Sequence, residues 1–174
     1  MKKLFAILTL SSSLLLAEGF TLKSETVSGQ FGKKQEFNGF GCSGENISPD
    51  LSWENAPKGT KSFALTVYDP DAPTGSGFWH WVVFNIPKSV SKLEEGFGNK
   101  PHKDIIQSLN NYGTNSFGGA CPPVGDKAHR YEFTIHALDV DKLELDEKTN
   151  PAVVGFYLNS HTIEKSTLTA YYKR

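Results

Sequence analysis

Ionisable side chains stand at the ends of three apolar runs of this 174-residue chain: Asp69 ends one run, and His80 and His129 begin the other two. Two imidazoles can donate to an oxyanion, and a carboxylate can orient an imidazole through its second ring nitrogen. If the three run ends meet at one edge of the core, they form a small-ligand pocket with apolar walls. Asp71 and Tyr131 are close enough in sequence to join it.

Other interpretations of these residues stay open at this point. Taken singly, each has a structural explanation: an aspartate capping a turn, a histidine at a strand end, a tyrosine hydroxyl at the surface. A metal site is not expected, because the candidate ligands are scattered without close histidine spacing. A hydrolase would need a nucleophile, and Ser43, Ser76 and Ser116 lie in glycine-rich loops but not in a G-x-S-x-G elbow. With no Walker A loop and no dinucleotide-binding fingerprint either, we predict a binder rather than an enzyme, with no cofactor.

The elements that position these residues are three predicted strands, spanning 61–69, 80–86 and 129–137. Each run alternates in the way that places every second side chain on one face of a sheet. In the second run this alternation puts four side chains together: His80, Val82, Phe84 and Ile86.

Turn residues and one helix signal complete the expected fold. A Pro/Gly-rich turn follows Asp69, and a long Gly/Asn/Ser loop spans about 96–125. Asn150 and Pro151 provide a cap and a first helical residue for a helix reaching Leu158. The tail 161–172 fits either a helical turn or a last strand. With 38% hydrophobic residues, the chain is predicted to form one mostly β domain, a sandwich or barrel, with a small helical element near the C-terminus.

Residues 1–17 have the pattern of a secretory signal peptide: two lysines, a short apolar run and Ala17 as the expected cleavage site. The run is too short and too interrupted by serine to favour a transmembrane helix, although an uncleaved anchor is the alternative. We therefore expect a mature domain of 18–174, exported to a bacterial periplasm and without a transmembrane segment. The formal net charge of the whole chain is −1, so no nucleic-acid partner is predicted.

The chain has two cysteines, Cys42 and Cys121, each in a Gly/Pro-rich loop. An oxidising compartment favours a disulfide between them, and closing a loop of about 80 residues would stabilise the fold by about 4 kcal/mol. The alternative is a pair of buried thiols. Neither cysteine has a Cys or His partner at zinc-binding spacing.

Four motifs together resemble the phosphatidylethanolamine-binding protein family, in particular its bacterial YbhB/YbcL branch of Raf-kinase-inhibitor-like proteins. They are DPDAP at 69–73, FWHWVVFNIP at 78–87, CPP at 121–123 followed by HRY at 129–131, and NISPDLSW at 46–53. The resemblance spans roughly residues 38–172 and keeps the motifs in order.

The resemblance implies an antiparallel β-sandwich of Greek-key character with small peripheral helices, and a pocket for phosphate or phosphoethanolamine-like groups. It implies seven ligand-binding residues: Asp69, Asp71, His80, Cys121, Pro123, His129 and Tyr131. Trp79 and Trp81 would be candidate pocket walls. The leading hypothesis is therefore a non-enzymatic binder of small anionic or phosphorylated ligands. The alternative, by analogy with the family, is a module that inhibits a kinase or hydrolase or modulates an envelope or host partner.

Overall fold

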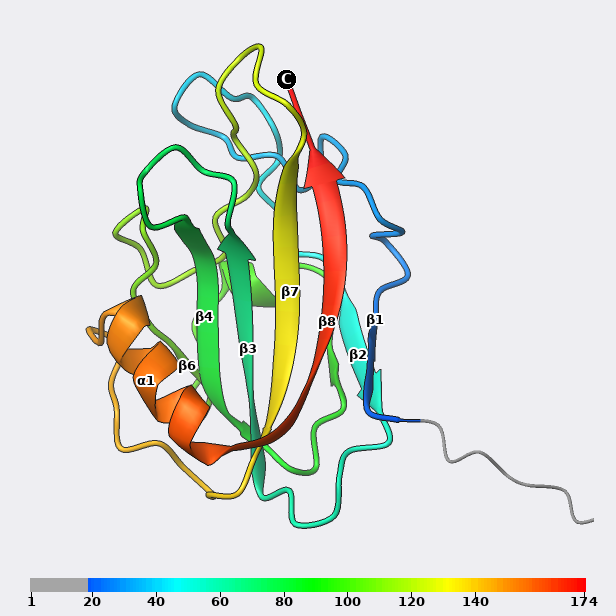
Figure 1. The fold of residues 1–174 in the computed structure, drawn as a ribbon, viewed down its shortest axis with the longest axis vertical. Coiled ribbons are helices and arrows are strands. Elements are labelled where there is room, and N and C mark those ends of the chain that lie inside the picture. Colours follow the sequence, from blue (N-terminus) through cyan, green and yellow to red (C-terminus); the bar gives the residue numbers. More distant parts are fainter. Residues whose placement is uncertain (1–18) are drawn as a thin grey trace, which may run out of the picture.

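A five-stranded antiparallel sheet forms the centre of the molecule (Figure 1). The computed structural model describes residues 19–174, so the predicted signal peptide lies outside the described residues. The sheet has the strand order β6–β4–β3–β7–β8, with bounds Ile106–Gln107, Phe78–Pro87, Ser62–Asp69, His129–Leu138 and Thr162–Tyr172. Strands β3, β4, β6 and β7 lie in Greek-key order, since β7 returns to pair beside β3. The three predicted strands are confirmed, and the ambiguous tail is a strand.

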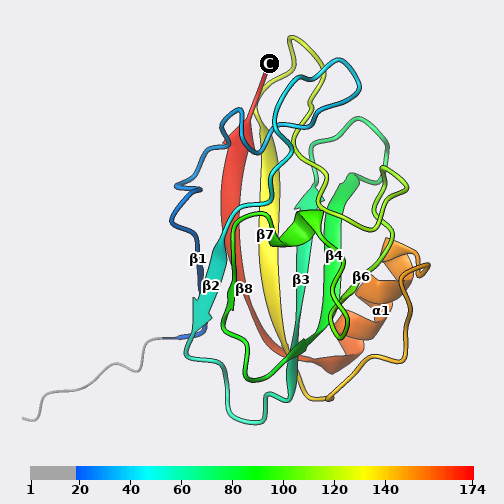
Figure 2. The same cartoon turned by 180° about the vertical axis from the view of Figure 1, so that it is seen from behind.

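A smaller sheet covers one face of this large sheet (Figure 2). It consists of β1 (Thr21–Lys23), β2 (Leu51–Glu54) and β5 (Lys92–Leu93), again antiparallel. The main core lies between the two sheets and takes side chains from both, including Leu51 and Trp53 from the small sheet and Leu65, Phe133 and Ile135 from the large one. The expected β-sandwich is therefore confirmed.

Helix α1 (Pro151–His161) packs on the opposite face of the large sheet. It begins as predicted, because the Asn150 side chain accepts a hydrogen bond from the Ala152 amide at 2.8 Å and proline occupies the first helical position. Val154 and Leu158 of the helix bury a second, smaller apolar cluster against the sheet. A 3₁₀ turn spans Phe97–Asn99. Over residues 19–174, no helix is long and apolar enough to cross a membrane.

Two irregularities in β4 overturn the predicted face of that strand. The pairing of β4 with β3 shifts register between Val67 and Tyr68, which leaves His80 without a partner, and again between Phe63 and Leu65. Asn85, beside the second shift, has a left-handed φ of 59°. Each extra residue reverses the alternation of the strand. Consequently, Trp81, Val83 and Ile86 enter the main core, while Val82 and Phe84 pack under α1, and the prediction that His80, Val82, Phe84 and Ile86 share a face is wrong.

Candidate functional site

A cavity of about 180 Å³ lies where the C-terminal end of β3 meets the N-terminal ends of β4 and β7. These strand ends meet because β3 pairs antiparallel with both β4 and β7. The pairing brings Asp69, His80 and His129 to the same end of the sheet. The cavity is lined by Phe40, Asp69, Ala72, Pro73, Thr74, Phe78, His80, Tyr112, Cys121, Pro122, Pro123, His129 and Tyr131. Six of the seven residues implied by the resemblance therefore line this cavity. The seventh, Asp71, does not line it.

Asp69 and His129 form a buried pair at the base of the cavity. The side chains are 4% and 2% exposed, so both are shielded from bulk solvent. His129 Nδ1 lies 2.8 Å from Asp69 Oδ2, and the backbone amide of Asp71 donates to Asp69 Oδ1 at 2.8 Å. His129 Nε2 is 3.4 Å from Asp126 Oδ2 at the surface. The imidazole is thus held by a carboxylate on each side, and its Nδ1 hydrogen is donated to Asp69.

His80 occupies the wall beside this pair and is neutral at neutral pH. Its Nδ1 donates to the Gly118 carbonyl oxygen at 2.8 Å, so in the neutral ring Nε2 is the nitrogen that accepts a hydrogen bond. Burial lowers the pKa of His80 to about 4, although the Gly118 carbonyl and the Asp69 charge act in the opposite direction. The first bulge of β4 places this side chain among aromatic rings, with Phe78, Tyr112 and Tyr131 at centroid distances of 5.2, 5.5 and 5.0 Å.

Tyr131 brings an unused donor to the cavity. The residue is only 1% exposed, and within residues 19–174 its hydroxyl has no hydrogen-bond partner. Burial raises the pKa of Tyr131 well above its ordinary value, and the Asp69 charge adds to this, so the hydroxyl keeps its proton. A buried hydroxyl without a partner is uncommon, because it gives up its hydrogen bonds to water without replacement. Tyr131, a residue of the cavity wall, therefore carries one donor that the described residues do not satisfy.

Three aromatic residues of the cavity were not predicted as site residues: Phe40, Phe78 and Tyr112. Tyr112 stacks on Phe40, with ring centroids 5.7 Å apart, and meets Phe78 edge to face at 4.8 Å. Its hydroxyl donates to the Gly119 carbonyl oxygen at 2.9 Å. Phe40 sits at the mouth, 77% exposed, with a left-handed φ of 52°. Phe78 could have been found from the sequence, because it stands two residues before His80 within the motif at 78–87. Phe40 and Tyr112 come from irregular loops whose approach has no local sequence signal.

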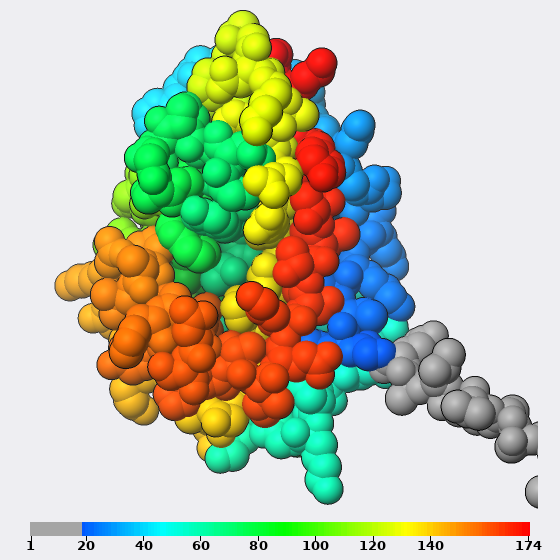
Figure 3. Space-filling model, in the orientation of Figure 1, coloured from blue at the N-terminus to red at the C-terminus, as the bar shows by residue number. Residues whose placement is uncertain are grey.

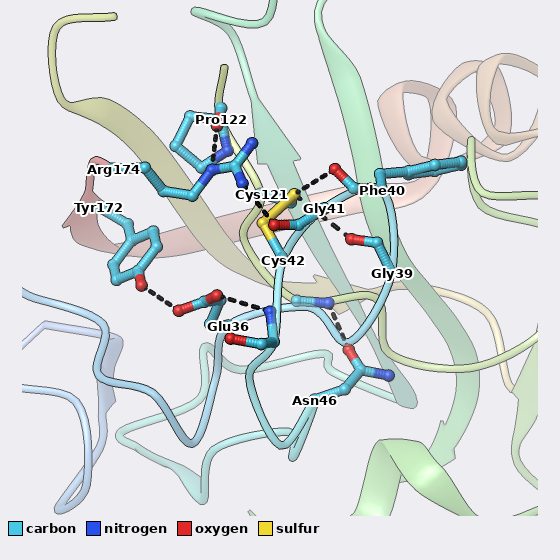
Figure 4. The surroundings of a disulfide bond; sticks show 12 residues. Glu36, Gly39, Phe40, Gly41, Cys42, Asn46, Cys121, Pro122, Tyr172 and Arg174 are labelled. Atoms are coloured by element: carbon cyan, nitrogen blue, oxygen red, sulfur yellow. Dashed lines mark hydrogen bonds between the residues drawn. A yellow bond between two sulfur atoms is a disulfide. The ribbon is translucent and has the colours of Figure 1, made fainter. Parts of the chain in front are cut away.

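A disulfide between Cys42 and Cys121 closes one wall of the cavity (Figure 4), with the two Cα atoms 5.9 Å apart. The prediction of this pairing is confirmed. Arg174 is hydrogen-bonded to the loops that carry the two cysteines. Its Nε donates to the Pro122 carbonyl and its Nη1 to the Gly41 carbonyl, each at 2.8 Å. The wall therefore joins three distant segments of the chain, including its C-terminus.

A buried carboxylate anchors the loop that carries Cys42. Glu36, 1% exposed, accepts a hydrogen bond from the Tyr172 hydroxyl (Figure 4). It also accepts one from the Ser43 amide and forms an ion pair with Lys33. Burial alone would raise the pKa of Glu36. The hydrogen bonds from Lys33, Tyr172 and Ser43 outweigh it and lower the pKa to about 2.

Asp71 has a different set of partners from the other implied residues. Its carboxylate accepts from the Arg130 amide at 3.0 Å and from Arg130 Nε at 2.8 Å, and it pairs with Lys127 at 3.2 Å. The hydrogen bond from the Arg130 side chain is the main reason why the pKa of Asp71 lies far below its usual range. These contacts tie the loop after β3 to the start of β7, so Asp71 positions Asp69 and His129 from outside the cavity.

The two tryptophans expected as pocket walls lie elsewhere. Trp79 packs with the cluster under α1, on the opposite face of the sheet. Trp81 is fully buried in the main core and donates its indole N–H to Gln107 Oε1 at 2.6 Å. The prediction that the two tryptophans line the pocket is wrong. At the bulge, the His80 side chain points to the cavity, whereas those of Trp79 and Trp81 do not line it.

The charge of the cavity is unusual for an anion site. The described residues that line it include no lysine and no arginine, and its ionisable side chains are Asp69, His80, His129 and two tyrosines. Within residues 19–174 there is also no group of three or more His, Cys, Asp or Glu side chains placed to hold a metal ion. Hydrogen bonds and aromatic faces, rather than a cluster of fixed positive charges, are what this site offers a ligand.

The molecule is an antiparallel β-sandwich with a Greek-key large sheet, a helix on the outer face of that sheet, and a small cavity with mainly apolar walls at one end of it. The chain belongs to the phosphatidylethanolamine-binding protein family, whose model matches residues 27–173.

Among its relatives, the UPF0098 proteins YbcL and YbhB of Escherichia coli K12 are 48% and 46% identical to it. The YbcL match covers 79% of this chain and 77% of YbcL, and the YbhB match covers 78% and 87%. The crystal structure of E. coli YbcL superposes with a TM-score of 0.87 at 44% identity, over 90% of this chain and 99% of that one. A homologue from Chlamydia trachomatis, CT736, gives 0.75 at 31% identity, over 90% and 98%.

Proposed function

We propose that the protein is an exported, non-enzymatic binder of small phosphorylated ligands, and that the cavity at the end of the large sheet is its binding site. The observation that carries this proposal is the unpartnered hydroxyl of Tyr131, a residue that lines the same cavity as His80 and the Asp69–His129 pair. A phosphate oxygen would accept from that hydroxyl. Family membership supports the general role of a binder.

The volume of the cavity sets the size of the ligand. At about 180 Å³ it holds the equivalent of roughly six water molecules. That is enough for a head group but below the range of about 300–1,000 Å³ that is usual for sites enclosing a larger ligand. The remainder of a larger molecule would have to extend past Phe40 at the mouth.

The charges favour a zwitterionic ligand over bare phosphate. A phosphate dianion would face the buried Asp69 carboxylate with no lysine or arginine to offset it, and His80 is neutral because burial lowers its pKa to about 4. An ammonium group removes this conflict: it donates to the free nitrogen of His80, is attracted by Asp69, and contacts the aromatic faces of Phe78 and Tyr112. Phosphoethanolamine offers both signs of charge in one small molecule.

Isothermal titration with phosphoethanolamine, ethanolamine and inorganic phosphate tests this assignment. We expect phosphoethanolamine to bind more tightly than either part at pH 7. Inorganic phosphate should gain affinity as the pH falls toward the pKa of His80, because protonation turns that ring into a second donor. If all three fail to bind between pH 4 and pH 7, or if inorganic phosphate binds best at pH 7, the proposal is wrong.

A non-enzymatic role is supported by the state of the possible nucleophiles around the cavity. The Cys121 sulfur is bonded to Cys42, the Thr74 hydroxyl donates to the Gly77 carbonyl, and the raised pKa of Tyr131 keeps its phenol protonated. We expect no turnover of nitrophenyl phosphate or nitrophenyl acetate above buffer. Turnover that disappears in a His80→Ala variant would instead indicate a hydrolase.

Export to a periplasm is the part of the proposal that rests on residues 1–17. Mass measurement of the protein from the periplasmic fraction of the source bacterium should give a chain that begins at Glu18. A chain retaining Met1 in the membrane fraction would contradict it.

One observation favours a second candidate function, a protein-interaction module. Phe40 and Val124 are each 77% exposed, and Phe40 stands at the mouth of the cavity. Contiguous exposed apolar patches are typical of interaction surfaces, and Phe40 and Val124 would belong to such a patch. The partner would be a kinase, a hydrolase or an envelope protein, by analogy with the family. In a pull-down with a candidate partner, Phe40→Ser would abolish capture while His80→Ala would preserve it; the reverse pattern would return function to the cavity.

A further inference from the structure

A groove lies on the outer face of the large sheet, beside helix α1 and away from the cavity described above. Two adjoining hollows of about 580 and 240 Å³ share four lining residues, and so form one continuous depression. The shared residues are Tyr68, Trp79, Gly155 and Asn159. Figure 3 shows the recess between α1 (orange), the β3–β4 segment (green) and β7 (yellow).

The groove and the cavity use consecutive residues of the same two strands. Tyr68 and Trp79 face the groove, whereas Asp69 and His80, next in the chain, face the cavity. Successive side chains of a strand point to opposite faces, so the two sites are separated by the sheet. A ligand in the groove would not compete with one in the cavity.

The floor of the groove is an aromatic pair. The rings of Tyr68 and Trp79 have centroids 4.5 Å apart and both residues are half-buried. The Tyr68 hydroxyl donates to the Ser76 carbonyl, which holds the ring in place. The indole N–H of Trp79 has no acceptor among the described residues, although its backbone amide donates to Asn111 Oδ1. The floor therefore presents a fixed apolar surface and one unused donor.

The space above this floor is kept open by a glycine. Gly155 lies in the middle of α1, where glycine weakens a helix relative to alanine. A Cβ at this position would meet nothing within 4 Å, so packing inside the chain does not require glycine. Gly155 lines both hollows, and any long side chain there would project into the groove.

The polar groups around the floor suit an uncharged ligand. The lining includes hydroxyl and amide groups that both donate and accept, from Thr66, Thr134 and Asn159. Thr66 is 5% exposed, and the Thr134 hydroxyl lies 3.0 Å from that of Thr167, so Asn159 is the most accessible of the three. Its two charged side chains, Glu132 and Lys165, have opposite signs, and His136 is neutral at pH 7 because burial lowers its pKa to about 4. A bound phosphate or carboxylate would find no excess positive charge here.

We propose that this groove is a second binding site, for a neutral carbohydrate. The C–H face of a pyranose ring would lie on Tyr68 and Trp79, since the electron-rich faces of aromatic rings attract weakly positive C–H groups. Its hydroxyl groups would pair with Asn159 and with the Trp79 indole. Sugar rings combine one apolar face with a polar edge, as this groove combines an aromatic floor with a hydroxyl and amide rim.

An NMR titration of the ¹⁵N-labelled protein with cellobiose, maltose and N,N′-diacetylchitobiose tests this inference. We expect at least one of them to shift the Trp79 indole and the Gly155 and Asn159 amides saturably at millimolar concentration, with His80 and Asp69 unaffected. Gly155→Leu should abolish these shifts by filling the groove, whereas Gly155→Ala should keep them and raise the stability of the helix. Circular dichroism checks that both variants are folded.

Three results would overturn the inference. The first is the absence of saturable shifts with all three sugars. The second is a response that survives in a folded Gly155→Leu variant. The third is a response of these residues to phosphoethanolamine rather than to the sugars. An Asn159→Ala variant adds a readout independent of the helix glycine, and we expect it to weaken binding roughly tenfold, as loss of one good hydrogen-bonding side chain does.

Discussion

Asp69 and His129, sixty residues apart in the chain, form a buried hydrogen bond of 2.8 Å between Oδ2 and Nδ1 at the base of the cavity. Removing water from a carboxylate is costly, and this pairing together with the Asp71 amide is what offsets the cost. The pair therefore connects stability with the geometry of the candidate site.

The first prediction concerns the loss of this pairing. His129→Ala leaves the Asp69 carboxylate buried with one partner fewer, and we expect it to lower the free energy of unfolding by roughly 3–5 kcal/mol. The matched control is His161→Ala. His161 pairs with Asp139 at 3.0 Å, but the side chains are 33% and 56% exposed, so its loss should cost less than about 1 kcal/mol. Urea denaturation measures both, and equal losses would show that the buried pair has no special role.

The second prediction separates binding from stability at Tyr131. Because its hydroxyl is buried without a partner, Tyr131→Phe should leave the free energy of unfolding unchanged or raise it by up to about 1 kcal/mol. The same variant should weaken phosphoethanolamine binding about tenfold or more, since a hydrogen bond to a charged group is lost.

Tyr112→Phe is the control for this variant. The Tyr112 hydroxyl already donates to the Gly119 carbonyl, so its removal should destabilise the protein by about 1 kcal/mol. A Tyr131→Phe variant that is destabilised while binding normally would refute the role given to its hydroxyl.

The third prediction concerns acid. Burial lowers the pKa of His80 and of His136 to about 4 from 6.5 in the unfolded chain. Between these values the unfolded chain binds more protons than the folded protein, so stability is full above about pH 6.5 and falls as the pH drops toward 4. Each histidine contributes a slope of at most about 1.4 kcal/mol per pH unit.

Urea denaturation across this pH range measures the effect. His80→Gln and His136→Gln should each flatten the decline, and the double variant should flatten it further. A decline that is the same in the double variant and in the parent protein would contradict this assignment.

The fourth prediction concerns the disulfide. Cys42 and Cys121 close a loop with a sequence separation of 79, and in the chain-entropy model opening it lowers the free energy of unfolding by about 4–5 kcal/mol. Phosphoethanolamine binding should also weaken in the Cys42→Ser/Cys121→Ser variant, because Cys121 lines the cavity. Chemical reduction of the parent protein is the control, and it should reproduce both changes. If the reduced protein is weaker in stability but binds unchanged, the disulfide does not shape the cavity.

Much of the fold follows from local patterns. The three strand runs, the Asn150 cap and the proline at the first helical position depend on nearest neighbours along the chain, and all are found as predicted. The faces of β4 could not be predicted, because its two bulges are set by the pairing with β3, which alternation within one strand does not reveal.

The residues of the candidate site also fall into those that local sequence patterns could predict and those that long-range contacts place. Asp69, His80 and His129 stand at strand ends, so antiparallel pairing was enough to bring them together. Phe40 and Tyr112 reach the cavity through irregular loops held by the disulfide and by Arg174, which are long-range contacts. Asp71 shares a motif with Asp69 yet pairs with Arg130 at the start of β7, a long-range contact that the motif alone does not reveal.

The central claim is that a small phosphorylated zwitterion binds beside Tyr131 and His80. The most direct measurement is a backbone-amide NMR titration with phosphoethanolamine on the parent protein and on the Tyr131→Phe and His80→Ala variants. We predict saturable shifts of the amides of Asp69, His80, Cys121 and His129 in the parent protein, strongly reduced in both variants. Absence of shifts at millimolar ligand, or shifts that persist unchanged in the two variants, would contradict the account.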